Sequence, residues 1–308
     1  MSGVKVPDNP GYSWDAPLAS TSLLTAVDHV GDEIYAVGTF GHILKASGGD
    51  LDIWEQTSVP TRVLLNSVHM SAEGYGWAVG HDAIILKTTD GLQWQKVHEA
   101  IEEQRPLLDI WFRDRQHGFA VGAYGYFLST SDGGESWQDR LINEEHDYHL
   151  NAITDDGNGN LYIAAESGYI YRSNDGGETW QVLNPPYEGS FFDISADGDT
   201  VITVGLRGHI FVSDDAGESW RRIESGVESA LTSIAPLKSG RVVITGHAGV
   251  VLLLDEKSNY VTKYQLSDRS ALSGAIAIDN KLVLAGEHGL SRLDLCEAFR
   301  SHLPGDCK

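Results

Sequence analysis

Apolar and polar residues follow one another along this chain in short runs, and one arrangement of these runs returns seven times. An apolar run ends in small residues, a Gly-x-x-Gly phrase follows, and a second apolar run begins, as in YAVGTFGHIL from Tyr35. Short runs on either side of a glycine-containing loop predict β-hairpins. The phrases recur at intervals of about 40 residues, with the first small residue at Gly38, Gly80, Gly122, Ala165, Gly205, Gly246 and Gly286.

Each repeat resolves into four predicted strands. In the third repeat they span about 107–113, 117–122, 125–131 and 135–141, whereas the seventh shows only three, at 272–278, 281–286 and 289–295. Residues 11–18 include Tyr12-Ser13-Trp14, which resembles Glu135-Ser136-Trp137 of a fourth strand. We expect this N-terminal strand to complete the seventh repeat, because a closed ring leaves no open sheet edge.

The repeats predict an all-β fold, a seven-bladed β-propeller that forms one domain over residues 1–308. A ring of about 40-residue blades needs about 300 residues, which leaves no room for a second domain before the C-terminal tail at 296–308. The Gly-x-x-Gly phrases are not nucleotide-binding fingerprints, because no helix follows them to hold a phosphate.

A second phrase, the Asp-box, marks the turn before the fourth strand. It reads TSDGGESW at 130–137, SNDGGETW at 173–180 and SDDAGESW at 213–220, with a shorter copy, TTDGLQW, at 88–94. Its Asp accepts hydrogen bonds from turn amides and a hydroxyl group, so the phrase predicts a stabilised turn. We expect the Trp side chains of the three full copies to be buried between blades. The predicted structural residues are Asp90, Asp132, Trp137, Asp175, Trp180, Asp215 and Trp220.

The composition narrows the class of partner. A net charge of −22, from 44 acidic and 22 basic residues, repels phosphate backbones and anionic lipid. No apolar run approaches the roughly 18 residues of a spanning helix, so we expect no nucleic-acid partner and no direct membrane insertion. The start, Met1-Ser2-Gly3-Val4-Lys5, does not resemble an export signal.

The two cysteines, Cys296 and Cys307, both lie in the C-terminal tail. Pro304-Gly305 between them can turn the chain back, which favours a local disulfide and an oxidising compartment. The alternative is a pair of free thiols. Their spacing does not suit a zinc site.

The loops predict a binding surface. In a propeller, the loops between second and third strands share one face with the loops between blades, and the Asp-box turns lie on the other face. Arg side chains there suit carboxylates or phosphates, which predicts a partner-binding rim. Alternatively, each Arg pairs with a local acid such as Asp82, Glu103 or Glu166. The candidate residues are Arg62, His81, Asp82, Arg105, Tyr124, His149, Glu166, Arg207, His247, Arg269, Glu287 and His288.

No metal site and no cofactor are predicted. His81, His247 and His288 come from separate repeats and lack a local ligand spacing. The segment Asp156-Gly157-Asn158-Gly159-Asn160 resembles half of a calcium loop but lacks that loop's distal Glu, so a hairpin turn is favoured.

The phrases WAVGHDAIILKTTDG from Trp77 and FAVGAYGYFLSTSDGGESW from Phe119 resemble the photosystem II assembly and stability factor family of seven-bladed propellers, and more closely its bacterial relatives in non-photosynthetic organisms. The resemblance covers residues 24–295. It implies a non-catalytic assembly or accessory protein with a protein partner. Bacterial members are often exported, which implies a periplasmic location, and are linked to transporters of the resistance–nodulation–division type. The arginine-rich face of photosynthetic members corresponds here to Arg62, Arg105, Arg207 and Arg269. We expect the protein to be a monomer.

The rival class is an enzyme. Asp-boxes also mark sialidases and other glycoside hydrolases, which need paired carboxylates, and sialidases add an Arg triad and a Tyr nucleophile. The chain offers those residue types in Arg62, Arg105, Arg207, Tyr124, Glu166 and Asp82. Against this class, the Arg-Ile-Pro phrase of sialidases is missing. A propeller lyase that uses metal-bound His is a third option.

Overall fold

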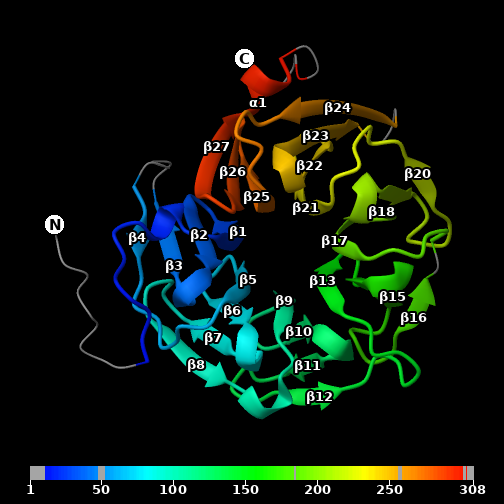
Figure 1. Ribbon diagram of the computed structural model, residues 1–308. Helices are drawn as coiled ribbons and strands as arrows, with labels where there is room; N and C mark the ends of the chain where they lie inside the picture. The colour runs from blue at the N-terminus through cyan, green and yellow to red at the C-terminus, as the bar shows by residue number, and fades with distance from the viewer. Residues whose placement is uncertain (1–10, 48–52, 184, 256–258, 301–302, 304–308) are drawn as a thin grey trace. The chain divides into compact units, whose positions relative to one another are not determined.

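The computed structural model describes residues 11–47, 53–183, 185–255, 259–300 and 303, and nearly all of its regular structure is β (Figure 1). Seven consecutive antiparallel sheets form the blades of a seven-bladed β-propeller, as the repeats predict. The chain divides into two compact units, Met1–Leu141 with Ala285–Leu290, and Ile142–Leu284 with Ser291–Lys308. The prediction of a single domain therefore stays a prediction. None of the helices described has the length and hydrophobicity to cross a membrane.

The first unit contains three four-stranded sheets in which each strand pairs with the next along the chain. Their strands are β1 Leu24–Val30, β2 Glu33–Gly38, β3 Ile43–Ala46 and β4 Glu55–Gln56; β5 Leu65–Met70, β6 Gly76–Gly80, β7 Ile85–Thr88 and β8 Trp94–His98; and β9 Leu107–Phe112, β10 Gly118–Gly122, β11 Phe127–Thr130 and β12 Gln138–Arg140.

The second unit contains three more sheets of four strands. The last sheet has three strands; most of it belongs to the second unit, but its β26–β27 turn, Ala285–Leu290, belongs to the first unit. Their strands are β13 Leu150–Asp155, β14 Leu161–Ala165, β15 Ile170–Ser173 and β16 Gln181–Leu183; β17 Phe191–Asp197, β18 Thr200–Gly205, β19 Ile210–Ser213 and β20 Arg221–Ile223; β21 Leu231–Pro236, β22 Val242–Gly246, β23 Val250–Asp255 and β24 Tyr260–Gln265; and β25 Leu272–Ile278, β26 Lys281–Gly286 and β27 Gly289–Asp294.

The helices are short. Six of the Gly-x-x-Gly loops, two of them with an Ala in place of one Gly (Ala83 and Ala165), each form one 3₁₀ turn: η2 Thr39–Gly41, η3 His81–Ala83, η5 Ala123–Gly125, η6 Glu166–Gly168, η7 Leu206–Gly208 and η8 His247–Gly249. The others are η1 Ala19–Thr21, η4 Ile101–Glu103 and α1 Leu295–Ala298. Asp294 caps α1 by accepting hydrogen bonds from the Cys296 and Glu297 amides. Cys296 is disulfide-bonded, as one of the two alternatives predicts, and Cys307 lies outside the described residues.

The cores lie between neighbouring sheets. Every residue of β6, β10, β14 and β22 is buried, because sheets cover these second strands on both faces, and this explains their continuous apolar sequence. Val37 and Ile43 of the first sheet pack with Leu65 and Val68 of the second.

A β-bulge near the start of the first strand recurs in the six four-stranded sheets. In β1, Leu24 and Ala26 face consecutive residues of β2, which leaves Thr25 as the extra residue. A bulge redirects a side chain, and the Thr25 hydroxyl donates to the Leu65 carbonyl of the next sheet at 2.6 Å. In the same way, Asn66 Nδ2 donates to the Leu107 carbonyl at 2.7 Å, and the Thr232 hydroxyl donates to the Leu272 carbonyl at 2.8 Å.

The Asp-box turns have the predicted geometry. Thr130 donates its hydroxyl to Asp132 Oδ1 at 2.8 Å, and the Ser136 hydroxyl donates to Asp132 Oδ2 at 2.6 Å. Asp175 and Asp215 accept the equivalent hydrogen bonds, whereas Asp90 accepts only from Thr88 and turn amides. These carboxylates stabilise turns.

The prediction that the Asp-box Trp side chains are buried is wrong for all three full copies. Trp137, Trp180 and Trp220 are half-buried, because each follows the turn at the start of an outer strand. The buried contact between blades comes from the second strand instead: fully buried Trp77 donates its indole N–H to the Gly133 carbonyl in the next sheet's Asp-box turn at 3.2 Å.

The predicted strand at residues 11–18 is also wrong. This segment forms no strand and lies along the end of the first sheet, where the Ser13 amide donates to the Val59 carbonyl at 2.8 Å and the Val59 amide donates to Ser13 Oγ. Gln56 holds the next residues through the Trp14 carbonyl and the Ala16 amide. Pro17 has no N–H for a sheet ladder, which disfavours the predicted pairing.

Truncation of Trp77 tests the contact between sheets. Trp77→Ala should lower the free energy of unfolding by about 3–5 kcal/mol, because it empties a fully buried site. Trp77→Phe should cost less, and Trp180→Ala, at a half-buried position, should also cost less. Urea unfolding measures the free energy of unfolding of all three variants. An equal decrease for Trp77→Ala and Trp180→Ala would contradict the conclusion that Trp77 provides the buried contact between sheets.

The Asp-boxes predict a pH dependence. The Ser136 hydroxyl and amide lower the pKa of Asp132 to about 2 from its ordinary value of 3.8. A lowered folded-state pKa stabilises the fold above about pH 4, and this contribution is lost as the pH falls towards 2. The stability gap between wild type and Asp132→Asn should therefore shrink over this window in urea unfolding. Ser136→Ala should move the loss to higher pH, and a gap that is constant from pH 6 to 2 would disprove the role.

Candidate functional site

The Gly-x-x-Gly loops share an unusual backbone. Their third residue is left-handed although it is not glycine, with φ between +56° and +59° at Phe40, Asp82, Tyr124, Ser167, Arg207 and Ala248. This conformation costs about 1–2 kcal/mol per residue. Phe40 and Tyr124 are 50% and 57% exposed, so the turn displays large side chains at the surface.

Close packing explains both glycines of the phrase. A Cβ at Gly80 would collide with the Leu64 carbonyl oxygen, and one at Gly41 would collide with the Thr61 carbonyl oxygen in the segment before the next sheet. The Gly41 amide also donates to the Val63 carbonyl at 2.9 Å. The first Gly thus packs against the first strand of its own sheet, and the second Gly holds η2 against the segment before the next sheet, where Arg62 lies.

Arg62 lies in an exposed aromatic group of the first unit. Its Nε donates to the Tyr12 carbonyl at 2.6 Å, and its guanidinium lies 4.9 Å from the Trp14 ring centroid. Trp14 and Phe40 have centroids 5.8 Å apart and are 40% and 50% exposed. The terminal guanidinium nitrogens of Arg62 make no hydrogen bond or ion pair with any described residue. We call Trp14, Phe40 and Arg62 the Trp14–Arg62 cluster.

Arg105 is held locally instead, as the alternative interpretation predicts. One terminal nitrogen lies 2.6 Å from Glu103 and 3.1 Å from Asp139, and the guanidinium covers the Tyr126 ring at 3.9 Å. This arginine therefore stabilises its own loop.

His149 and Glu166, in the second unit, bind each other. His149 Nδ1 lies 3.2 Å from Glu166 Oε1, the His149 amide donates to Oε2 at 3.1 Å, and the Glu166 amide donates to the His149 carbonyl. Arg207 is exposed in η7. The Tyr187 hydroxyl donates to the Leu206 carbonyl beside it at 3.2 Å.

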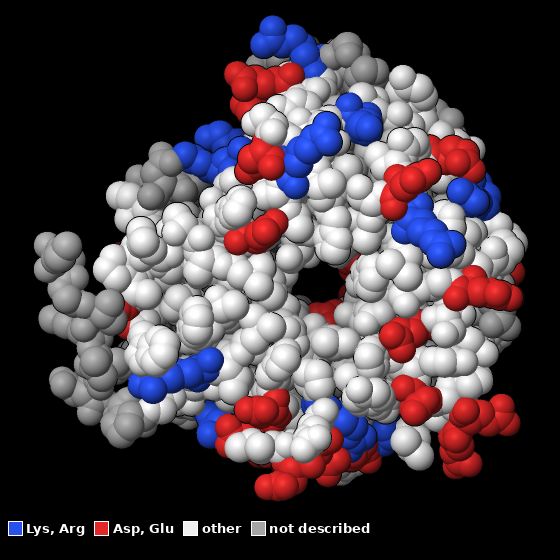
Figure 2. Space-filling model, in the orientation of Figure 1, with Lys and Arg blue, Asp and Glu red and all other residues white. Residues whose placement is uncertain are grey.

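The other predicted residues stand at the surface without forming a cluster that could hold a metal among the described residues. His81, His247, Arg269, Glu287 and His288 are exposed, and Asp82 is half-buried. The twelve predicted residues come from both units, so their convergence on one rim stays a prediction. On the face in Figure 2, basic side chains stand singly or in small groups beside acidic ones.

The Asp156 segment is a hairpin turn, as expected. Asp156 Oδ1 accepts hydrogen bonds from the Asn158 and Asn160 amides at 2.8 and 3.0 Å.

Two residues of the Trp14–Arg62 cluster were missing from the predicted set. Phe40 stands at the exposed position of its loop, where an aromatic residue is itself a signal. The sequence predicts Trp14 in a strand at residues 11–18, and no local sequence motif indicates its position beside Arg62.

Seven sheets, four of them with an Asp-box turn before the outer strand, define the class, an Asp-box β-propeller. A family model described as "Photosynthesis system II assembly factor YCF48" matches residues 92–243. "Photosystem II assembly lipoprotein Ycf48" of Prochlorococcus marinus (strain MIT 9313) is 35% identical over 96 residues, 31% of this chain and 28% of the relative. "Photosystem II stability/assembly factor HCF136, chloroplastic" of Arabidopsis thaliana is 26% identical over 157 residues, 44% of this chain and 39% of the relative. The match thus covers under half of each relative's length. Over residues 92–243, just under half of its length, the chain is similar to the photosystem II assembly factors.

Solved structures support the fold. One described as "YCF48 bound to D1 peptide" aligns with a TM-score of 0.70 at 18% identity and covers 94% of this chain and 98% of that chain. Virginiamycin B lyase from Staphylococcus aureus aligns at 0.77 with 13% identity and covers 88% and 94%. Likeness at this identity concerns the fold alone, so the lyase adds no catalytic argument.

Proposed function

We propose that this chain is a non-catalytic protein-binding module that assists the assembly of a larger complex, and that it binds a carboxylate-bearing segment of its partner at the Trp14–Arg62 cluster. One observation carries the proposal. The Arg62 guanidinium, whose terminal nitrogens have no described partner, lies against the exposed Trp14 ring, and Trp14 in turn packs against the exposed Phe40 ring.

The chemistry of the cluster favours a protein ligand. Trp and Arg are among the residues that dominate binding hot spots, and a guanidinium offers a planar fork that matches a carboxylate. Arg62 is held by its Nε and by Trp14, so little side-chain entropy is lost when a ligand binds. Exposed Tyr124, on a loop of the same unit, is a candidate to extend the contact.

The relatives support the same class of function. Their names describe assembly or stability factors, and one solved relative holds a peptide. Several relatives are named lipoproteins, which favours an exported protein. A periplasmic location, a monomeric state and a link to resistance–nodulation–division transporters stay predictions, and the comparisons offer no support for the transporter link.

Two of the residues that a glycoside hydrolase would need are already engaged in ion pairs. Arg105 is paired with Glu103 and Asp139, and Glu166 with His149. Neither side chain is available to a substrate without breaking these pairs.

A peptide array tests the proposal. The array carries apolar peptides with one Glu, each beside its Gln counterpart, and the wild type should prefer the Glu members. Arg62→Gln should weaken that binding about tenfold or more, because a charge-assisted contact is lost.

Arg113→Gln is the matched control. Arg113 is an exposed arginine of the same unit, but it follows β9 and therefore lies at the strand ends opposite the Gly-x-x-Gly loops. It should bind as the wild type does. Equal binding by Arg62→Gln, or no preference for Glu peptides, would rule out the cluster as the site.

A further inference from the structure

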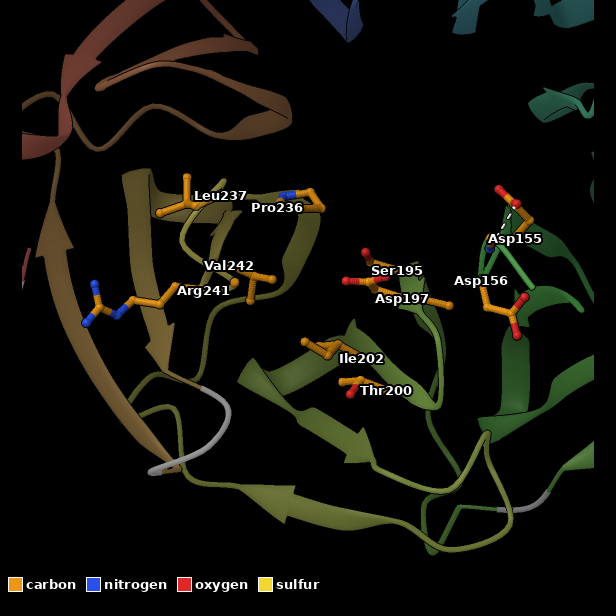
Figure 3. Close-up of a pocket in the computed structure, with 13 residues that line it drawn as sticks. Asp155, Asp156, Ser195, Asp197, Thr200, Ile202, Pro236, Leu237, Arg241 and Val242 are labelled. Carbon is orange, nitrogen blue, oxygen red and sulfur yellow. Dashed lines mark hydrogen bonds between the residues drawn. The ribbon is translucent and has the colours of Figure 1, made fainter. Parts of the chain in front are cut away.

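The second unit contains a cavity of about 400 Å³ that is distinct from the loops discussed above. Three hairpins line it: β13–β14, β17–β18 and β21–β22 (Figure 3). These hairpins join first to second strands, so they lie at the opposite strand ends from the Gly-x-x-Gly turns. The volume falls in the range of about 300–1,000 Å³ that is usual for ligand sites.

One wall of the cavity is acidic. Asp155, Asp156 and Asp197 line it, and Figure 3 shows them on neighbouring hairpins. Asp156 is buried and its carboxylate is used by its own turn, whereas Asp155 accepts only the Gly157 amide, at 3.1 Å. Asp197 is exposed and makes no side-chain hydrogen bond or ion pair with a described residue. Two carboxylates therefore keep acceptor capacity.

The opposite wall is largely apolar. Pro236, Leu237 and Val242 form it, together with Arg241. Arg241 is the one basic side chain that lines this cavity, and its Nε lies 3.6 Å from Asp255 Oδ2. The cavity thus offers uncompensated negative charge beside apolar surface, which suits the alkyl stem and the charged head of a basic side chain.

A second cavity, of about 300 Å³, adjoins the first. The two share Leu237, and the second is lined by Leu295 and Leu303 and by Lys238, which pairs with Asp279 at 2.9 Å. The two cavities form a row across the ends of successive hairpins. A row suits an extended chain better than a compact ligand.

We propose that this row binds an extended peptide segment of a partner protein, with an Arg or Lys side chain against Asp155 and Asp197 and a neighbouring apolar side chain against Leu237 and Leu295. This site is independent of the Trp14–Arg62 cluster, and its ligand has the opposite charge.

Calorimetry with defined peptides tests the proposal. The probe is acetyl-Leu-Ala-Arg-Ala-Leu-amide, and its control carries citrulline, a neutral isostere, in place of Arg. The Arg peptide should bind about tenfold more tightly than the citrulline peptide, and the affinity should fall as salt is added. Arginine amide alone should bind more weakly than the peptide, because it leaves the second cavity empty.

Variants locate the site. Asp197→Asn should weaken the Arg peptide several-fold, whereas Asp199→Asn, the same change two residues on and outside the cavity, should not. Arg62→Gln should leave binding unchanged, which separates this site from the one proposed above. No binding at millimolar peptide, equal binding of the citrulline peptide, or equal effects of Asp197→Asn and Asp199→Asn would overturn the proposal. Arginine amide binding as tightly as the peptide would overturn the extended-segment part of it.

Discussion

The hydrogen bond from a bulged residue of one sheet to the first strand of the next is the constraint on which much of this structure depends. Thr25, Asn66, Asn151 and Thr232 make it, whereas the bulged Leu108 and Phe192 have no side-chain donor. Thr25 shows the arrangement: its hydroxyl donates to the Leu65 carbonyl of the next sheet at 2.6 Å, and its oxygen lies 3.1 Å from the Val37 carbonyl oxygen of its own sheet. Thr232 repeats it with Thr245 and Leu272. Because the backbone groups involved are half-buried or buried, losing such a donor would leave a carbonyl poorly satisfied. The bulge therefore fixes the spacing between sheets.

The spacing between sheets also explains the conformation of the Gly-x-x-Gly loops. A loop such as η2 can approach the next sheet only because Gly41 carries no Cβ, and the approach holds Phe40 in a left-handed conformation at the surface. The same approach brings Arg62 beside Trp14. A strained, exposed aromatic residue and an arginine fixed by its neighbours are thus consequences of the packing between sheets, and they are available for binding without rearrangement.

The strands and the repeat could be predicted because each sheet repeats one apolar pattern, and the predicted ends of β25 and β26 match the structure. The bulges could not, since Thr25, Asn66 and Leu108 share no residue type; only backbone pairing distinguishes them. The prediction of a strand at residues 11–18 is wrong because Ser13 and Trp14 resemble an outer strand, while their partners Val59 and Arg62 are about 50 residues away. Arg62 and Arg105 have equivalent positions in the repeat, but only Arg105 forms ion pairs, with Glu103 and Asp139.

Site-specific photo-crosslinking in cells that express the chain tests the central claim, that the protein binds a partner through the Gly-x-x-Gly loops. A photoreactive phenylalanine analogue is placed at Phe40 or at Leu92, two large apolar residues of the first unit with similar exposure, 50% and 47%. Phe40 lies on a Gly-x-x-Gly loop, and Leu92 lies on an Asp-box turn at the other strand ends. The account predicts a discrete protein adduct from position 40 that Arg62→Gln abolishes, and none from position 92. An adduct from position 92 alone would contradict it.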